Sequence, residues 1–137
     1  MNAISFRPWT AWALRQDIEG CGQPGVYLLG MFPLNPPHEV DPLAAEIIYI
    51  GETCDQNLRK RWYQFNRSAF EQKFGHSGGL SFASRFCEVR EHTGLHVAAL
   101  PVARDEPHRS AYIRFVERRL IWDYVQKFNA LPRCNSK

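Results

Sequence analysis

The sequence predicts an α+β fold, with a small, mainly antiparallel sheet of three strands flanked by helices. Three apolar runs rich in β-branched or aromatic residues, at 26–29, 44–50 and 95–102, are typical of strands. Apolar residues recur at intervals of three and four in 58–69 and 110–128, which indicates helices. A chain of 137 residues suits one domain with one core.

The first half of the chain reads as a helix followed by two strands. Residues 9–18 have the spacing of a short amphipathic helix. The glycines and proline of "GCGQPGVYLLG" indicate a loop that leads into the strand at 26–29. Four prolines in "FPLNPPHEVDP" (32–42) predict an irregular surface excursion before the strand at 44–50. We expect these two strands to pair as antiparallel neighbours.

The second half of the chain is mainly helical. Thr53 and Gln56 have the spacing of a capping box for a helix that is expected to run to about Phe74. A second helix is predicted over 82–91, and a third over 110–128. The segment "GHSGG" between the first two helices reads as a break, because glycines disfavour helix interiors.

Composition narrows the class of protein. Apolar residues make up 45% and charged residues 23%, which is a globular balance. No apolar run approaches the roughly 20 residues of a membrane span, and the N-terminus lacks the pattern of a secretory signal. We therefore expect no membrane contact and a cytoplasmic location. The net charge of +3 permits a nucleic-acid partner without requiring one. The cysteines form no CxxC pair and are expected to be reduced: Cys21, Cys54, Cys87 and Cys134.

Glu117 interrupts an apolar stripe on the last helix. Ile113, Glu117 and Ile121 are four residues apart and therefore stack on one face. A carboxylate there is costly unless it is paired or coordinated. Arg114, three residues earlier, has the spacing for an ion pair within the helix, and Arg118 is the alternative partner if the helix faces solvent. The alternative is a metal ligand, because a lone carboxylate with waters and phosphate oxygens suits Mg²⁺.

Arg61 and two tyrosines also have two interpretations each. Arg61 lies on the inner edge of its helix, where its stem can pack or its planar guanidinium can clamp a phosphate. Tyr27 and Tyr49 each sit at the end of an apolar strand, where tyrosine usually packs. If the strands pair, however, the two phenols converge at one end of the sheet. Ile48 and Ile50 are expected on one face of the sheet, with Tyr49 on the other.

Taken in order, these residues resemble the GIY-YIG nuclease family. The resemblance rests on "GVY" at 25–27, "YIG" at 49–51, "NLRKRW" at 57–62, a helical glutamate and a late asparagine. It runs from about residue 24 to 135, within a single domain over 1–137, and implies a metal-dependent endonuclease that hydrolyses phosphodiester bonds of DNA with one Mg²⁺ (or Mn²⁺) ion. The implied site has Tyr27 as the proposed general base for the attacking water, Tyr49 beside the scissile phosphate, Arg61 on the phosphate, Glu117 on the metal, and Gly25, Gly51 and Asn135 in support.

Two of the departures from the family pattern concern residues near the implied site. Phe65 stands four residues after Arg61, where the family often has histidine or tyrosine, and Tyr63 or His76 is a candidate substitute. Glu52 follows the second motif, where many members carry lysine. A carboxylate there weakens phosphate binding unless it turns away or assists the metal.

The partner is expected to be DNA, with RNA not excluded, because the chemistry is the same on either backbone. A non-catalytic module that binds nucleic acid or protein on the same fold is the rival hypothesis. The chain has little room for a separate recognition domain, so we expect weak sequence specificity, a preference for a DNA structure, or a partner protein that supplies targeting. A homodimer would be needed to cut both strands together. Basic residues near the implied site form either a solvated face or a set of phosphate contacts: Arg59, Lys60, Arg67, Arg114 and Arg118.

Overall fold

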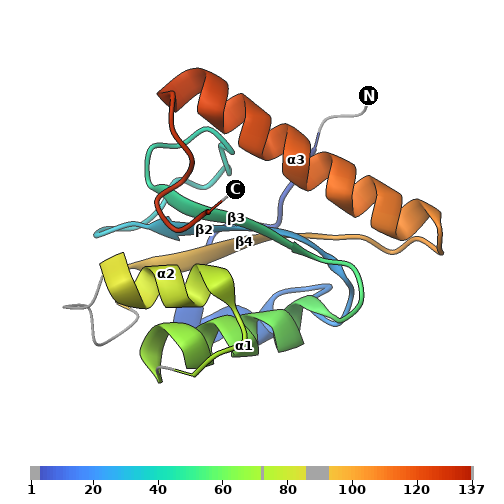
Figure 1. Cartoon of the computed structure of the whole chain (residues 1–137), viewed down its shortest axis with the longest axis horizontal. Coiled ribbons are helices and arrows are strands. Elements are labelled where there is room, and N and C mark those ends of the chain that lie inside the picture. Colours follow the sequence, from blue (N-terminus) through green and yellow to red (C-terminus); the bar gives the residue numbers. More distant parts are fainter. Residues whose placement is uncertain (1–3, 72, 86–92, 137) are drawn as a thin grey trace.

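The computed structural model describes residues 4–71, 73–85 and 93–136. One antiparallel sheet has strand order β1-β4-β2-β3, with α1 and α2 on one face and α3 on the other (Figure 1). The α+β class is therefore confirmed. The elements in chain order are β1 (Thr10–Ala11), the 3-10 helix η1 (Trp12–Asp17), β2 (Gly25–Met31), β3 (Ile47–Thr53), α1 (Leu58–Phe70), α2 (Ser77–Arg85), β4 (Leu95–Pro101) and α3 (His108–Phe128).

The sheet has four strands, so the prediction of three was wrong. The helix expected over 9–18 is a short strand followed by η1. β1 pairs with the edge of β4, placing Thr10 opposite Val97, which satisfies backbone groups that an open edge would leave unpaired. The buried Trp12 then anchors η1, and its indole N–H donates to Asn66 Oδ1 on α1 at 2.8 Å.

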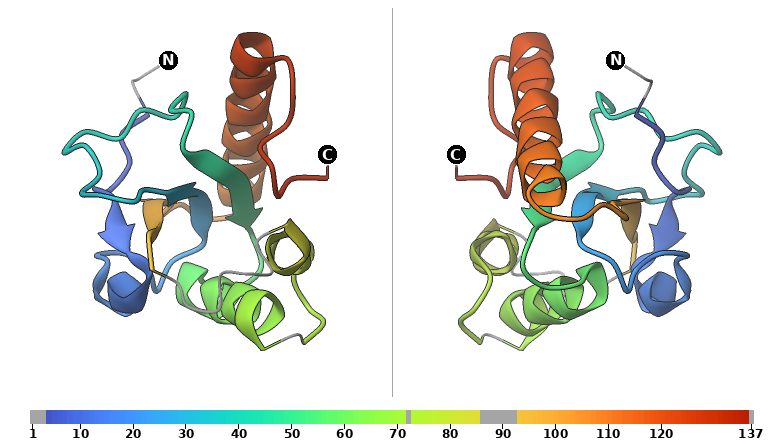
Figure 2. Two further views of the ribbon diagram at one scale, coloured as in Figure 1. Left: turned by 90° about the vertical axis from the view of Figure 1, so that its left-hand side faces the viewer. Right: turned by 90° about the vertical axis from the view of Figure 1, so that its right-hand side faces the viewer.

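Each face of the sheet carries its own hydrophobic core. Figure 2 shows the helices that cover the two faces, α1 and α2 on one side of the sheet and α3 on the other. Side chains alternate along β2, so Tyr27 and Leu29 face one core while Val26 and Leu28 face the other. We call the two the α1 core and the α3 core. The α1 core includes Trp12, Tyr27, Trp62, Phe65 and Phe82, and the α3 core includes Val26, Ile50, Ile113, Val116 and Leu120.

α1 buries the face that its sequence period predicted, with Leu58, Trp62, Phe65 and Ala69 turned inward. Its start differs from the prediction. The N-cap is Asn57, whose side chain accepts the Lys60 N–H at 2.8 Å, and the helix ends at Phe70 rather than near residue 74.

α2 begins at Ser77 and contains the two glycines that were expected to break the chain. Close packing explains this result, because a Cβ at Gly79 would lie 2.6 Å from Ser68 Cβ and 2.8 Å from Phe65 O. The predicted helix over 82–91 thus starts five residues earlier, and its second half lies outside the described residues. Cys87 is also outside them, whereas Cys21 and Cys54 are buried thiols without a disulfide.

A β-bulge in β3 decides where its side chains point. The pairing with β2 shifts at Gly30, which lies opposite Ile47 and leaves Ile48 as an extra residue. Ile48 therefore packs in the α1 core beside Tyr49, whereas Ile50 packs in the α3 core. The expectation that Ile48 and Ile50 share a face of the sheet was wrong, although Tyr49 does lie on the other face from Ile50.

α3 starts two residues before the predicted position and ends as expected, at Phe128. Ser110 donates through N–H and hydroxyl to the Glu106 carboxylate, at 2.8 and 2.6 Å, which satisfies one free N–H of the first turn. After α3 the chain folds back along β3, and the Cys134 N–H donates to Ile48 O at 2.8 Å. Within the described ranges, no helix has the length and apolar character required to cross a bilayer.

Candidate active site

The pairing of β2 with β3 brings the two tyrosines together. Tyr27 lies opposite Gly51, and the ring centroids of Tyr27 and Tyr49 are 5.9 Å apart. A Cβ at Gly51 would lie 2.7 Å from Tyr27 Cζ and 2.8 Å from its hydroxyl oxygen. The predicted convergence of the phenols is confirmed, and the glycine leaves the space that it requires.

His76, from the turn before α2, contacts both tyrosines. Its Nε2 lies 2.7 Å from the Tyr27 hydroxyl, and its ring packs edge-on against Tyr49. The Gly79 N–H donates to His76 Nδ1 at 3.2 Å. Nδ1 is therefore an acceptor, so a neutral ring carries its proton on Nε2 and donates it to Tyr27. Burial, and then the charge of Arg61, lowers the pKa of His76 to about 3, which keeps the ring neutral.

The two phenols differ in their access to solvent. Tyr27 is 0% exposed, whereas Tyr49 is only partly buried. Burial raises the pKa of Tyr27 well above its usual value and that of Tyr49 to about 12, while the Arg61 charge opposes both shifts. Hydrogen bonding with Tyr27 also lowers the pKa of Tyr49. Tyr49 is thus the phenol that can meet a substrate directly.

Glu117 lies with Tyr49 in a cavity of about 250 Å³ between β3, α2, α3 and the C-terminal tail. Burial and the neighbouring charge of Glu52 raise the pKa of Glu117 to about 7, and Arg118 opposes this shift. Among the described residues Glu117 forms no ion pair. The carboxylate therefore lacks a partner that would offset the free-energy cost of burying its charge. The lining residues are Tyr49, Ser77, Glu117, Arg118, Asn135 and Ser136.

The oxygen atoms around Glu117 fit a hard cation. Glu117, Ser77 and Ser136 line the same cavity, and Mg²⁺ prefers oxygen ligands such as these residues carry. No cluster of three or more histidines, cysteines or acidic residues suited to a metal occurs in the described part of the chain. An ion at Glu117 would therefore keep most of its waters, as Mg²⁺ commonly does.

Arg61 lies in a second hollow, of about 340 Å³, which Glu52, Lys60 and Arg114 also line. Its guanidinium donates to Gln64 Oε1 at 2.8 Å and to the Gly75 carbonyl at 3.2 Å. These contacts hold the guanidinium at the hollow, where it can receive an anion. Its charge acts on Tyr27, Tyr49 and His76, so it is also within electrostatic range of the tyrosine pair.

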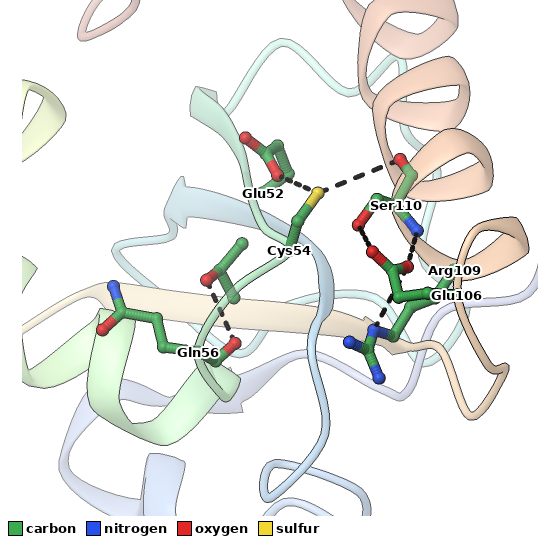
Figure 3. A network of polar contacts seen from close by, with 7 residues as sticks. Glu52, Cys54, Gln56, Glu106, Arg109 and Ser110 are labelled. Carbon is green, nitrogen blue, oxygen red and sulfur yellow. Dashed lines mark hydrogen bonds and ion pairs between the residues drawn. The ribbon is translucent and has the colours of Figure 1, made fainter.

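Glu52 faces the site rather than turning away from it. The Cys54 thiol donates to Glu52 Oε2 at 3.1 Å, and its sulfur lies 3.9 Å from Ser110 O (Figure 3). Burial and Glu52 raise the pKa of Cys54 to about 11, which keeps it a protonated donor. Glu52 is thereby connected to the first turn of α3, and its charge raises the pKa of Glu117.

Asn135 fastens the C-terminal tail to the outer edge of β3. Its Oδ1 accepts the Ile50 N–H at 2.9 Å, and its Nδ2–H donates to Ile50 O at 3.0 Å. The side-chain amide thus satisfies the backbone N–H and C=O of Ile50, as a neighbouring strand would do, at the edge of the sheet beside the site. Gly25 has a different place: a Cβ there would lie 3.0 Å from Pro101 Cα, so it permits close contact of β2 with β4.

The structure brings only some of the predicted basic residues to the two hollows. Lys60 and Arg114 line the hollow of Arg61, and Arg118 lines the cavity of Glu117. Arg59 instead donates to Cys21 Sγ at 3.2 Å, and Arg67 lies over the Tyr63 ring, 5.7 Å from its centroid. A phosphate track near the hollows would therefore use Lys60, Arg114 and Arg118.

Gly78 is a residue of the site that the sequence analysis missed. A Cβ at Gly78 would lie 2.5 Å from Tyr49 Cε1 and 2.7 Å from Cζ. The Tyr49 ring is therefore packed between Gly51 and Gly78. The available signal was "HSGG" itself, because adjacent glycines at the start of a helix indicate close contact when the helix forms at all.

We expect Gly78→Ala to lower the free energy of unfolding by about 1–3 kcal/mol, because the added methyl group overpacks the Tyr49 ring. Gly22→Ala is the matched control: nothing lies within 4 Å of its Cβ position. That change is expected to stay within about 0.5 kcal/mol. Urea unfolding of both variants measures the difference, and equal stability of the two would contradict the packing of Tyr49 against α2.

No protein-family model, curated protein or solved structure matches the chain.

Proposed function

We propose that this chain is a metal-dependent endonuclease of the GIY-YIG type, which hydrolyses phosphodiester bonds of DNA. The observation that carries the proposal is the position of Tyr49. Its pKa responds to Arg61, Glu117 and Tyr27, which come from three other elements. An acid–base group, a guanidinium and a costly carboxylate within range of one another form a set that suits phosphoryl chemistry.

Hydrolysis requires an acceptor for the proton of the attacking water and donors for the phosphoryl oxygens. We assign proton acceptance to Tyr27 and Tyr49 as a pair, rather than to Tyr27 alone, because only Tyr49 lines the cavity. Donation from His76 to the Tyr27 oxygen stabilises negative charge on the pair. Burial opposes this role by raising both pKa values, so the pair depends on positive charge close by.

The remaining residues act on the phosphate. Arg61, held by Gln64 and Gly75, neutralises charge on the phosphoryl oxygens with a planar pair of donors. Glu117, with the hydroxyls of Ser77 and Ser136, would hold one Mg²⁺ or Mn²⁺ ion. That ion, when bound, supplies Lewis-acid stabilisation of the developing charge.

The test is nicking of supercoiled plasmid DNA by the purified chain in Mg²⁺ or Mn²⁺. Arg61→Ala is expected to reduce the rate by about 10²–10³-fold, the usual effect of removing a well-placed donor. Arg119→Ala is the control on α3, because Arg119 is already paired with Asp123 at 3.2 Å. Full activity of Arg61→Ala would refute the assigned site. The same assay on an RNA of matched sequence decides between the two backbones.

The rival proposal is a binding module on the same fold that does not cut. The full burial of Tyr27 and the raised pKa values of both phenols favour it. The two proposals differ in one measurement. Binding of DNA without cleavage, over a titration of Mg²⁺ and Mn²⁺, supports the module and contradicts the nuclease.

A further inference from the structure

Trp122, on α3, is unusual among the tryptophans of this chain. Its side chain is 59% exposed, whereas Trp9, Trp12 and Trp62 are 8%, 0% and 0% exposed. Tryptophan is highly buried on average, and exposed aromatic residues are common where proteins bind partners. The position of the indole relative to the candidate site indicates what that partner is.

Trp122 continues a ridge of α3 that begins at the site. Arg114, Arg118 and Trp122 are four residues apart and therefore follow one another along the helix surface, with a rise of about 6 Å per step. Arg114 lines the hollow of Arg61, and Arg118 lines the cavity of Glu117. The ridge thus leads from both hollows to the exposed indole.

The charges on this ridge are available to an anion. In the described part of α3 the ion pairs are those of Arg109 with Glu106 and Arg119 with Asp123, so neither Arg114 nor Arg118 takes part in one. The neighbouring ridge, which contains Arg119 and Asp123, has its positive charge already neutralised. A phosphate backbone is therefore drawn to the first ridge and not to the second.

We propose that Arg114, Arg118 and Trp122 bind an unpaired nucleic-acid strand next to the scissile phosphate. The two arginines contact successive parts of the backbone, and an unpaired base stacks on the indole. A duplex hides the faces of its bases, so stacking on an exposed side chain requires a single-stranded segment. This proposal rests on the proposed nuclease function and names its substrate class: nucleic acid with a flap, gap or loop beside the cleavage site.

A protein partner or a second copy of the chain is the competing occupant. Phe115 lies on the same outer side of α3, seven residues before Trp122, and is 49% exposed. The two unpaired arginines beside the indole favour a polyanion over an apolar surface. Self-association remains measurable as a separate outcome.

Tryptophan fluorescence tests the proposal directly, because Trp122 is the exposed indole among four. The chain is titrated in EDTA with a single-stranded oligonucleotide and with a duplex of the same length, so that cleavage plays no part. We expect the single strand to quench the emission and the duplex to quench it much less. Trp122→Phe should remove the quenching and keep most of the affinity measured by anisotropy. Trp122→Ala should weaken binding by about 10-fold.

A matched pair of variants tests how much the arginines contribute to nucleic-acid binding. Arg118→Ala should weaken binding and reduce the slope of log affinity against log salt by about one, whereas Arg119→Ala should change neither. Leu34→Ala, which removes an 83% exposed apolar side chain from the proline-rich loop, is a second control.

Three results would overturn the proposal: binding without quenching, equal quenching by single strand and duplex, or quenching that depends on protein concentration without nucleic acid. The last result identifies a second copy as the occupant. Cleavage and binding fail separately here. If the single strand quenches the emission but is not cleaved when Mg²⁺ is added, only the proposed nuclease function is refuted. If DNA is cleaved but the emission is not quenched, only the proposed strand-binding site at Trp122 is refuted.

Discussion

Replacing Glu117 with glutamine is expected to slow metal-dependent cleavage strongly and, at pH 8, to stabilise the fold. The cleavage rate should fall on the order of 10²-fold or more, because the variant lacks the charged oxygen for a cation. The stability should rise because the native carboxyl is costly to ionise. Its pKa is raised from 4.5 to about 7, mainly by burial.

The pH window of this effect follows from the direction of the shift. Between about pH 4.5 and 7 the folded protein holds a proton at Glu117 that the unfolded chain has lost. Stability from this group is therefore complete below pH 4.5 and is lost as the pH rises to 7. The penalty above pH 7 is about 1–2 kcal/mol after allowing for solvent screening. Glu117→Gln should match the native chain at pH 4.5 and exceed it at pH 8.

Urea unfolding at both pH values, in EDTA and in Mg²⁺, separates the parts of this prediction. Mg²⁺ should stabilise the native chain at pH 8 and leave Glu117→Gln unchanged, because a ligand of the folded state adds to stability. Glu39→Gln, at an exposed position, is the control and should behave like the native chain. A variant that is less stable than the native chain at pH 8 would show that Glu117 has a favourable partner, contrary to this account.

Tyr27→Phe is expected to abolish cleavage and to lower the free energy of unfolding by about 1–3 kcal/mol. The ring and its packing against Trp62 are kept, at a centroid distance of 6.1 Å, so the loss comes from the hydroxyl. Without it the Nε2–H of His76, which is 1% exposed, has no partner. An unsatisfied buried donor costs its full desolvation.

A double-mutant cycle with His76→Phe isolates that contact. The double variant should be less destabilised than the sum of the single variants, by about 0.5–3 kcal/mol, because removing both partners leaves neither unsatisfied. Additive effects would mean that the 2.7 Å contact contributes little. Retained cleavage in Tyr27→Phe would remove the phenol pair from the mechanism.

The strands and the two long helices follow from local pattern. The apolar runs of β2, β3 and β4 and the inward face of α1 were predicted because burial on one face imposes a period of about two or 3.6 residues. The convergence of Tyr27 with Tyr49 followed from one further assumption, that neighbouring strands pair. These features depend on residues close together in the sequence, so the sequence by itself determined them.

Other features depend on contacts between distant segments. β1 forms because the edge of β4, more than 80 residues later, offers backbone groups to pair with. α2 tolerates Gly78 and Gly79 because α1 and Tyr49 occupy the space their side chains would need. The bulge that places Ile48 in the α1 core arises from the register of two strands rather than from either one.

The candidate site divides in the same way. The helical period alone placed the charged side chains of Arg61 and Glu117 on the inner faces of their helices. Both residues therefore stood out in the sequence, because burying a charged group is costly wherever the helix packs. The tertiary structure decided that His76 contacts Tyr27, that the charge of Glu52 acts on Glu117, and that Arg59 lies away from the hollows. Distances across the fold depend on how the layers pack, and no local pattern in the sequence encodes them.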